Sequence, residues 1–175
     1  MSKIDYDLKK IKGIAFDVDG VLSPATVPID SDGNPRRMAN IKDGYAMVQA
    51  LRHGLKLAII SGADTEPVRK RFELIGFNDI YLGHIEKLPV LCSWMEENGL
   101  SPEQVAYCGD DIPDILPMVH VGLPVAPRDA DPDVKAVARF ISTVNGGCGV
   151  ARELIEEVMK TQGTWPAADK RAYGK

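Results

Sequence analysis

Short apolar runs alternate with longer amphipathic segments along this chain. The apolar runs predict strands at 11–16, 56–60, 105–108 and 121–125, with a short last one at Phe140–Ile141. Apolar residues recur at helical spacing in four segments, which predict helices at 43–53, 65–75, 85–98 and 150–160. A strand followed by a helix, repeated, is typical of a parallel sheet covered on both faces. The expected fold class is therefore α/β, with a Rossmann-like parallel sheet.

The segment from Thr26 to Ile41 does not fit this alternation. It reads VPID, then SDGN, then PRRMANI, which predicts a β-hairpin turning at Asp32–Gly33. We therefore expect a flap of about residues 25–41 after the first strand. After Lys160 the pattern fades, so we expect one core domain over residues 1–160 and a C-terminal tail over 161–175.

Composition narrows the class of protein further. Lysine and arginine total 21 and aspartate and glutamate 25, so the net charge of −4 argues against a nucleic-acid partner. The three cysteines show no ligand-like spacing and are interpreted as reduced thiols. The charged start MSKIDYDLKK does not resemble a signal peptide, and no apolar run reaches the length of a membrane span. We expect a cytoplasmic protein that has no membrane partner.

Chemically capable residues follow three of the predicted strands. Asp17 and Asp19 follow the first, Ser61–Gly62 follows the second, and Gly109–Asp114 (GDDIPD) follows the run VAYC. Because ligands bind beyond the carboxyl ends of parallel strands, these residues should meet at one edge. Clustered carboxylates repel one another unless a cation holds them, and oxygen ligands favour Mg²⁺. With a hydroxyl and a lysine such as Lys87 nearby, such a site suits a phosphate monoester.

The order of these motifs resembles the haloacid dehalogenase superfamily of phosphotransferases. The four motifs are DVDGV at 17–21, Ser61 before Gly62, Lys87, and GDDIPD at 109–114. The resemblance implies that Asp17 is the nucleophile that forms an aspartyl-phosphate. It implies that Asp19 is the acid for the leaving alcohol and then the base for water. Ser61 and Lys87 would hold the phosphoryl oxygens, with Gly62 beside them.

The same resemblance implies a set of Mg²⁺ ligands. Asp110 would bind the ion together with Asp17 and the backbone carbonyl of Asp19, while Asp111 and Asp114 would orient the metal's waters and the lysine. Asp17 and Asp19 would then divide the work of phosphoryl transfer, because Asp17 attacks phosphorus and Asp19 moves a proton.

The spacing of the motifs leaves no room for a cap domain. The segments that separate Asp17, Ser61 and Lys87 are each shorter than the ~50 residues that an inserted domain usually needs. An open site would expose the aspartyl-phosphate intermediate to water. We therefore expect a macromolecular substrate or a neighbouring subunit to close the site. The flap is the expected docking element, because its edges can pair between copies.

Four further stretches resemble the capless phosphatases that act on 3-deoxy-D-manno-octulosonate 8-phosphate: IKDGYAM at 41–47, EQVAYCGDDIPDILPM at 103–118, VGLPVAPRDADPDV at 121–134 and GGCGVARELIEEVM at 146–159. This resemblance implies a homotetramer in which the tail reaches a partner's site. It places Lys42, Asp43 and Gly44 near the mouth of the site, with Arg71 and Arg128 as candidates for the sugar carboxylate.

Two departures keep other substrates and functions in view. A basic residue is common in these phosphatases where Ala63 and Cys148 stand, so a nine-carbon 2-keto-3-deoxy sugar 9-phosphate remains an alternative. A phosphoacceptor signalling domain also gathers acids, a hydroxyl and a lysine around Mg²⁺, but its paired acids lie on the first strand. A non-catalytic regulatory copy of the fold is the third alternative, against which the intact Asp17 and Asp19 argue.

Overall fold

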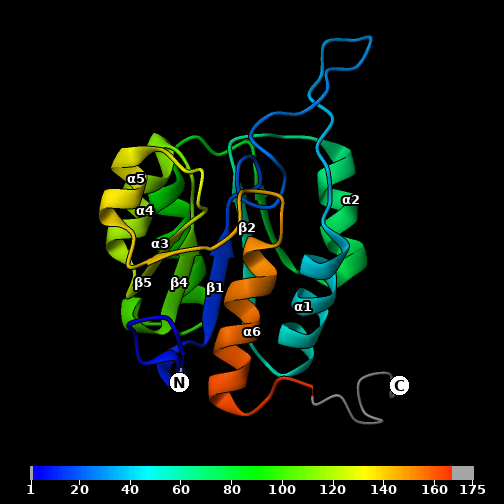
Figure 1. Ribbon diagram of the computed structural model, residues 1–175. Coiled ribbons are helices and arrows are strands. Elements are labelled where there is room, and N and C mark those ends of the chain that lie inside the picture. Colours follow the sequence, from blue (N-terminus) through cyan, green and yellow to red (C-terminus); the bar gives the residue numbers. More distant parts are fainter. Residues whose placement is uncertain (1, 167–175) are drawn as a thin grey trace.

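A single parallel sheet organises the protein (Figure 1). The computed structural model describes residues 2–166, and within them the strands run in the order β3-β2-β1-β4-β5-β6. Every pairing between neighbouring strands is parallel. The strand bounds are Gly13–Phe16 (β1), Lys56–Ser61 (β2), Asp79–Leu82 (β3), Val105–Cys108 (β4), Leu123–Ala126 (β5) and Phe140–Ile141 (β6). The predicted α/β class with a Rossmann-like parallel sheet is confirmed.

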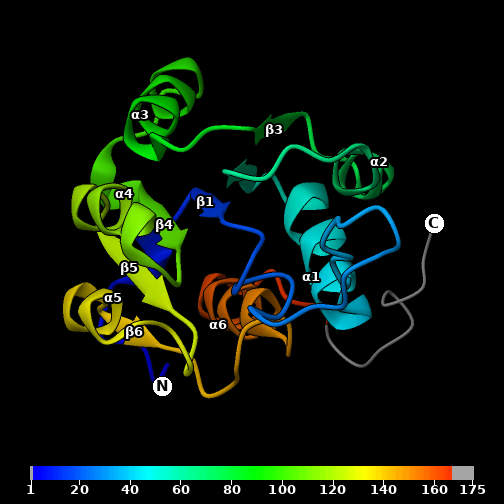
Figure 2. The same ribbon diagram turned by 90° about the horizontal axis from the view of Figure 1, so that it is seen from above.

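Helices cover both faces of this sheet (Figure 2). Their bounds are Ile41–Arg52 (α1), Glu66–Ile75 (α2), Lys87–Glu97 (α3), Ile115–His120 (α4), Pro132–Val137 (α5) and Val150–Gln162 (α6). One apolar core joins the sheet to α1, α2 and α6, and a second joins it to α3, α4 and α5. The four longer helices match the predicted helical segments to within a few residues.

Successive side chains of β1 point alternately into these two cores. Ile14 and Phe16 pack into the core of α1 and α6, whereas Ala15 packs into the core that contains Trp94 of α3. All three strand residues are fully buried. A strand buried on both sides is typical of parallel sheets and explains its continuous apolar sequence.

Three short elements had no clear pattern in the sequence: β3, α4 and α5. Strand β3 lies at an edge of the sheet, and three of its four residues are only partly buried, so it lacks the apolar run of a central strand. Helices α4 and α5 span six residues each, which is too short to display a helical repeat. Tertiary packing, rather than local pattern, defines these elements.

The flap forms the expected hairpin, with little regular pairing. It makes one isolated antiparallel bridge, Ile29 with Pro35, and contains no regular strand. Across the turn, the N–H of Asp30 donates to the carbonyl of Asn34 (2.9 Å), and the N–H of Arg36 donates to the carbonyl of Pro28 (2.8 Å). Pro28 and Pro35 have no N–H, so the ladder cannot extend. The flap ends at residue 40, where α1 begins, and projects beyond the carboxyl edge of the sheet (Figure 1).

The C-terminal boundary differs from the expectation. Helix α6 continues to Gln162, and the ring of Trp165 packs edge-on against Tyr45 of α1 with centroids 6.1 Å apart. Residues 161–166 thus belong to the folded body. The rest of the expected tail, 167–175, lies outside the described residues. Among the helices of the described part of the chain, none has the length and apolar content to cross a membrane.

Candidate active site

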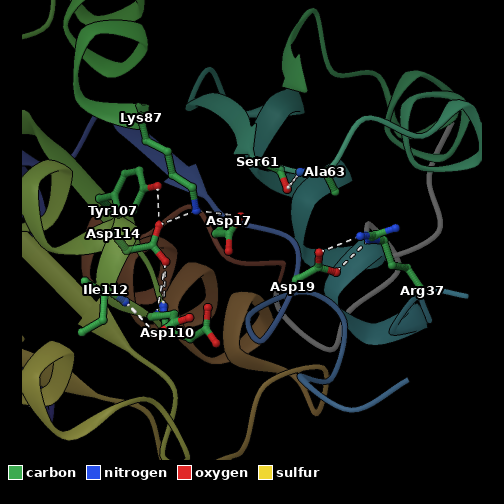
Figure 3. Close-up of polar contacts among 11 residues, drawn as sticks. Asp17, Asp19, Arg37, Ser61, Ala63, Lys87, Tyr107, Asp110, Ile112 and Asp114 are labelled. Carbon is green, nitrogen blue, oxygen red and sulfur yellow. Dashed lines mark hydrogen bonds and ion pairs between the residues drawn. The ribbon is translucent and has the colours of Figure 1, made fainter. Parts of the chain in front are cut away.

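Strands β1, β2 and β4 end side by side, and each delivers polar residues to the same edge of the sheet. The chain leaves β1 toward β2 on one side and later returns to pair β4 on the other, so β1 lies at the switch point of the topology. In open parallel sheets ligands bind at this point. Asp17 follows β1, Ser61 ends β2, and Asp110 and Asp114 follow β4. Figure 3 shows these side chains around one centre.

Lys87 joins the carboxylates that follow β1 and β4. It is the first residue of α3, and its Nζ lies 3.1 Å from Oδ1 of Asp17 and 2.7 Å from Oδ1 of Asp114. All three side chains are at least nine-tenths buried. A buried lysine between two buried carboxylates compensates part of their charge, which makes the close approach of the acids possible.

A network of donors fixes Asp114. Its Oδ1 accepts hydrogen bonds from Lys87 and from the hydroxyl of Tyr107 (2.8 Å), and its Oδ2 accepts from the backbone N–H groups of Asp110 (3.0 Å) and Asp111 (3.4 Å). Burial, followed by the nearby charge of Asp114, raises the pKa of Tyr107 well above its usual value, so its hydroxyl keeps the proton that it donates. Asp114 therefore holds the lysine and the β4 loop in place.

The local charges shift the protonation of this cluster. Burial, and then the charge of Asp114, raises the pKa of Asp17 to about 6, against the opposing effect of Lys87. Burial, and then Asp17 and Asp114, raises the pKa of Asp110 to about 8. Burial alone would lower the pKa of Lys87, but Asp17 and Asp114 together hold it above its ordinary value. Full ionisation of the cluster is therefore unfavourable, because one lysine does not compensate all of its carboxylates.

Gly20 makes room for Asp110. Its φ is +75°, and a Cβ at this position would lie 1.8 Å from Oδ2 of Asp110. A side chain here would combine an unfavourable backbone conformation with a direct clash. The glycine of the DVDGV motif therefore lets the β4 loop bring its carboxylate against the β1 loop.

Asp19 and Ser61 complete the opposite wall. The guanidinium of Arg37, in the flap, donates two hydrogen bonds to Asp19, from Nε to Oδ1 (2.7 Å) and from Nη2 to Oδ2 (2.8 Å) (Figure 3). The buried Ser61 hydroxyl accepts a hydrogen bond from the N–H of Ala63 at 3.3 Å. Both groups border a cavity of about 400 Å³, which is also lined by Asp17, Gly62, Lys87, Asp110, Asp111 and Asp114.

A second and larger cavity, of about 620 Å³, lies between the flap, α1 and α2. Its lining is mostly apolar and includes Met47 and Phe72, and it shares only Arg37 with the first cavity. The carboxylates that suit phosphate chemistry border the smaller cavity. We therefore take the smaller one as the candidate active site.

The residues expected at the mouth of the site lie elsewhere. Neither Lys42 nor Asp43, Gly44 or Arg71 lines the active-site cavity, and the last three border the larger one. The position of α1 explains this difference, because its first turn faces α2 and α6 instead of the strand ends. Asp43 is buried, and its Oδ1 accepts a hydrogen bond from the N–H of Arg152 in α6. Lys42 is exposed to solvent.

Two further candidates make contacts of their own, and the role expected for Asp111, which lines the active-site cavity, stays a prediction. The exposed Asp111 side chain accepts a hydrogen bond from the N–H of Ile112, so it caps the short helical turn 112–114. Arg128 donates to the side chain of Asn145 and does not line the active-site cavity.

Sequence reasoning missed two residues of the site. Tyr107 lies inside the apolar run VAYC, and nothing in that run indicates that its hydroxyl reaches Asp114. Arg37 lies in the segment PRRMANI, where two adjacent arginines show positive charge but do not indicate that either side chain reaches the site. Tyr107 contacts Asp114, 7 positions along the chain, and Arg37 contacts Asp19, 18 positions away, and neither contact follows from a local sequence pattern.

The donor set fits a hard divalent cation. Asp17, Asp110 and Asp114 each offer one carboxylate oxygen, and these atoms lie within 4.8 Å of one another. Both oxygens of Asp114 already accept hydrogen bonds, so Asp17 and Asp110 are the candidates for direct ligands. An all-oxygen set of this kind suits Mg²⁺ better than zinc or copper.

Comparison with known proteins agrees with this fold and site. A family model for haloacid dehalogenase-like hydrolases matches residues 73–154. The 3-deoxy-D-manno-octulosonate 8-phosphate phosphatase KdsC of Escherichia coli is 34% identical over 155 residues, which cover 89% of this chain and 82% of that protein. The enzyme of the same name from Haemophilus influenzae is 30% identical over 156 residues, covering 89% and 87%.

Solved structures give the same result. The phosphatase of Moraxella catarrhalis, solved with magnesium, phosphate and 3-deoxy-D-manno-octulosonate (KDO), has a TM-score of 0.85 and 31% identity, covering 89% of this chain and 90% of that one. The cobalt-bound phosphatase from Haemophilus influenzae has a TM-score of 0.89 and 28% identity, covering 96% and 99%.

Fold, motif order and site together define a haloacid dehalogenase-like hydrolase whose described residues include no cap domain. Within that class, the chain belongs to the KdsC family of 3-deoxy-D-manno-octulosonate 8-phosphate phosphatases. The resemblance inferred from the four motifs is thus confirmed.

Proposed function

We propose that this protein is a Mg²⁺-dependent phosphatase that hydrolyses 3-deoxy-D-manno-octulosonate 8-phosphate through an aspartyl-phosphate on Asp17. The observation that carries the proposal is the placement of Asp17, Lys87 and Asp110 around one cavity at the carboxyl edge of the sheet. The names of the Escherichia coli and Moraxella catarrhalis relatives support the substrate.

Asp17 is the nucleophile in this scheme. One of its oxygens attacks phosphorus, a P–O bond to Asp17 forms, and the P–O bond to the sugar breaks. Asp19 gives its proton to the departing sugar oxygen. Water then attacks phosphorus, Asp19 takes a proton from that water, and the bond to Asp17 breaks, which releases phosphate and restores both carboxyls. Splitting one displacement into two steps lets the same aspartate serve as acid and base.

The remaining side chains bind and align the phosphoryl group. Lys87 and the hydroxyl of Ser61 border the cavity and hold phosphoryl oxygens, and Asp114 keeps Lys87 in position. Asp17 and Asp110 would hold Mg²⁺, which would supply positive charge to the transferring group. Alignment and charge compensation are the main contributions that a protein makes to phosphoryl transfer.

The assembly and the location of the enzyme are also part of the proposal. We expect a homotetramer in which a neighbouring subunit covers the active-site cavity, acting in the cytoplasm. Exposed apolar side chains support a covered surface, since Ile29 and Met38 of the flap and Ile85 at the cavity are 71%, 55% and 77% exposed. Apolar groups of this size next to a binding cavity favour an interface.

Phosphate release from a panel of substrates tests the function. The panel contains the eight-carbon sugar acid 8-phosphate, a nine-carbon 2-keto-3-deoxy sugar acid 9-phosphate, and the neutral D-mannose 6-phosphate. We expect turnover that depends on Mg²⁺, is fastest with the eight-carbon substrate, and is lost in Asp17→Asn. Equal rates across the panel would contradict the sugar-acid assignment, and hydrolysis that survives exhaustive chelation would contradict the mechanism.

A further inference from the structure

The general acid of the proposed reaction is held by an arginine of the flap. Arg37 donates one hydrogen bond to each oxygen of Asp19, of 2.7 and 2.8 Å, which is the two-bond arrangement that is strongest between guanidinium and carboxylate groups. The side chain of Arg37 is only 12% exposed, whereas that of Asp19 is 45% exposed. Figure 3 shows this pair beside the group formed by Asp17, Lys87 and Asp114 and separate from it.

This pair conflicts with the role of Asp19. Nε and Nη2 of Arg37 each donate to a different oxygen of Asp19, so both oxygens are engaged. The departing sugar oxygen and Arg37 therefore compete for the same atoms. Proton transfer requires Arg37 to give up at least one of its two bonds.

The substrate can provide the alternative partner for Arg37. Among the residues that line the active-site cavity, two are cations, Lys87 and Arg37. Lys87 is engaged by two buried carboxylates. Arg37 is therefore the cation of this lining that can receive the substrate's own carboxylate, which has the same shape and charge as the side chain of Asp19.

We propose that Arg37 exchanges carboxylates: it holds Asp19 until a sugar acid enters and then transfers its two hydrogen bonds to the substrate, which releases Asp19 for proton transfer. This inference rests on the proposed function and adds a source of selectivity to it. No covalent bond changes in the exchange itself. Once Asp19 is released, its oxygens are free to approach the departing sugar oxygen. A neutral sugar phosphate leaves Arg37 on Asp19 and reacts slowly.

Three substrates separate the steps. The sugar acid 8-phosphate has a carboxylate and needs the general acid, D-mannose 6-phosphate needs the general acid but has no carboxylate, and p-nitrophenyl phosphate needs neither. The variants are Arg37→Gln and Arg37→Lys. The matched control is Arg36→Gln, because Arg36 is highly exposed and lies 3.9 Å from Asp30 instead of contacting Asp19.

In Arg37→Gln we expect kcat/KM for the sugar acid to fall by about 10- to 100-fold, as for loss of a charge-assisted pair. The kcat for D-mannose 6-phosphate should rise several-fold, because Asp19 is released, and p-nitrophenyl phosphate should change less than about two-fold. Arg37→Lys should recover part of the sugar-acid rate, since it keeps the charge but loses the planar fork. Arg36→Gln should leave all three substrates unchanged.

A loss of the same size on both sugar phosphates would overturn the exchange and leave Arg37 with a structural role. An unchanged ratio between the two substrates would overturn it as well. If the wild-type enzyme releases no phosphate from the sugar acid, the proposed substrate fails instead. In that case, the kcat of wild type and Arg37→Gln with D-mannose 6-phosphate still tests whether Arg37 restrains Asp19. Melting temperatures of the Arg37 and Arg36 variants identify any difference that comes from folding alone.

Discussion

Lys87 compensates the negative charge of the buried carboxylates in the site. It lies between Asp17 and Asp114, and all three are buried, so its removal would leave two carboxylates facing each other without water. Breaking a buried charge network by removing one partner is costly, because the remaining charges are not compensated. Its position at the first turn of α3 also fixes it at the wall of the active-site cavity.

Replacing this lysine should therefore disable catalysis. We expect Lys87→Met to lower kcat/KM for the sugar acid phosphate by at least about 100-fold, as for loss of a preorganised charge in an active site. The matched control is Lys70→Met, because Lys70 is exposed and pairs with Glu66 on the surface of α2. Steady-state phosphate release measures both. Activity of Lys87→Met within a few-fold of wild type would remove the lysine from the mechanism.

Gly20 offers a test of the metal site that leaves every carboxylate in place. We expect Gly20→Ala to displace Asp110, because the new Cβ would lie 1.8 Å from Oδ2, and to raise the half-saturating Mg²⁺ concentration by about ten-fold or more. Gly33→Ala is the control, since Gly33 also has a positive φ, of +84°, but has no atom within 4 Å of the added carbon. Equal Mg²⁺ dependence in the two variants would contradict a role for the close approach.

The motif residues could be placed from the sequence because topology does most of the work. Once the strands are parallel, Asp17, Ser61 and Asp110 must meet at one edge, whatever their separation in the chain. Arg37 could not be placed this way, because it lies in a flap that has no periodic pattern. The orientation of α1 was equally hidden, so Asp43 was expected at the mouth of the site and instead lies against α6.

At the scale of elements, Asp43 couples two helices. It lies in the first turn of α1, its Oδ1 accepts the N–H of Arg152 in the first turn of α6, and its Oδ2 is the one buried side-chain oxygen or nitrogen without a hydrogen-bond partner in the described part of the chain. Burial raises the pKa of Asp43 to about 6, only partly opposed by the Arg152 N–H and charge. Burial therefore favours the protonated carboxyl, against the contact with Arg152.

The sign of the pH dependence follows from this shift. The pKa in the unfolded chain is about 3.9, so the Asp43 contribution to stability is fully present below that pH and is lost as the pH rises through 6. Asp43→Asn keeps the acceptor but does not ionise. Between pH 4 and 7 we expect the free energy of unfolding of the variant to gain about 1–3 kcal/mol on wild type.

Urea unfolding of both proteins at several pH values measures this difference. The control is Asp32→Asn, because Asp32 lies exposed at the tip of the flap. Its difference from wild type should stay constant over the same range. A constant difference for Asp43→Asn as well would show that α6 accommodates the charged form without cost.

Elements were predictable from sequence to the extent that they are buried and long. The run VAYC gave β4 its observed bounds because all four residues are buried. Strand β3 was missed because its residues lie at the sheet edge, whereas the flap does form the expected hairpin. In the flap, Gly33 does supply the turn, but the two prolines limit the pairing to one bridge.

On the scale of the whole molecule, the flap is the element through which copies should associate. Light scattering at micromolar concentration should give four times the chain mass of 19.1 kDa. We expect Ile29→Asp to reduce that mass and to lower activity in parallel, because a charge at an apolar interface is costly and, in our proposal, a neighbouring subunit closes the site. Leu74→Asp is the control, since Leu74 is 84% exposed on α2. Dissociation without loss of activity would separate assembly from catalysis.

The acid cluster that serves catalysis should also weaken the fold when metal is absent. Asp17, Asp110 and Asp114 repel one another, and a bound cation stabilises the folded state through its affinity alone. In EDTA at pH 7 we expect Asp110→Asn to melt a few degrees above wild type, because asparagine keeps the shape but needs neither the charge nor the bound proton that the raised pKa of Asp110 imposes on the folded state. Adding Mg²⁺ should raise the melting temperature of wild type and of Asp111→Asn, whose exposed side chain only caps Ile112, but not that of Asp110→Asn. A lower melting temperature for Asp110→Asn in EDTA would mean that hydrogen bonding, and not repulsion, dominates the energetics of this edge.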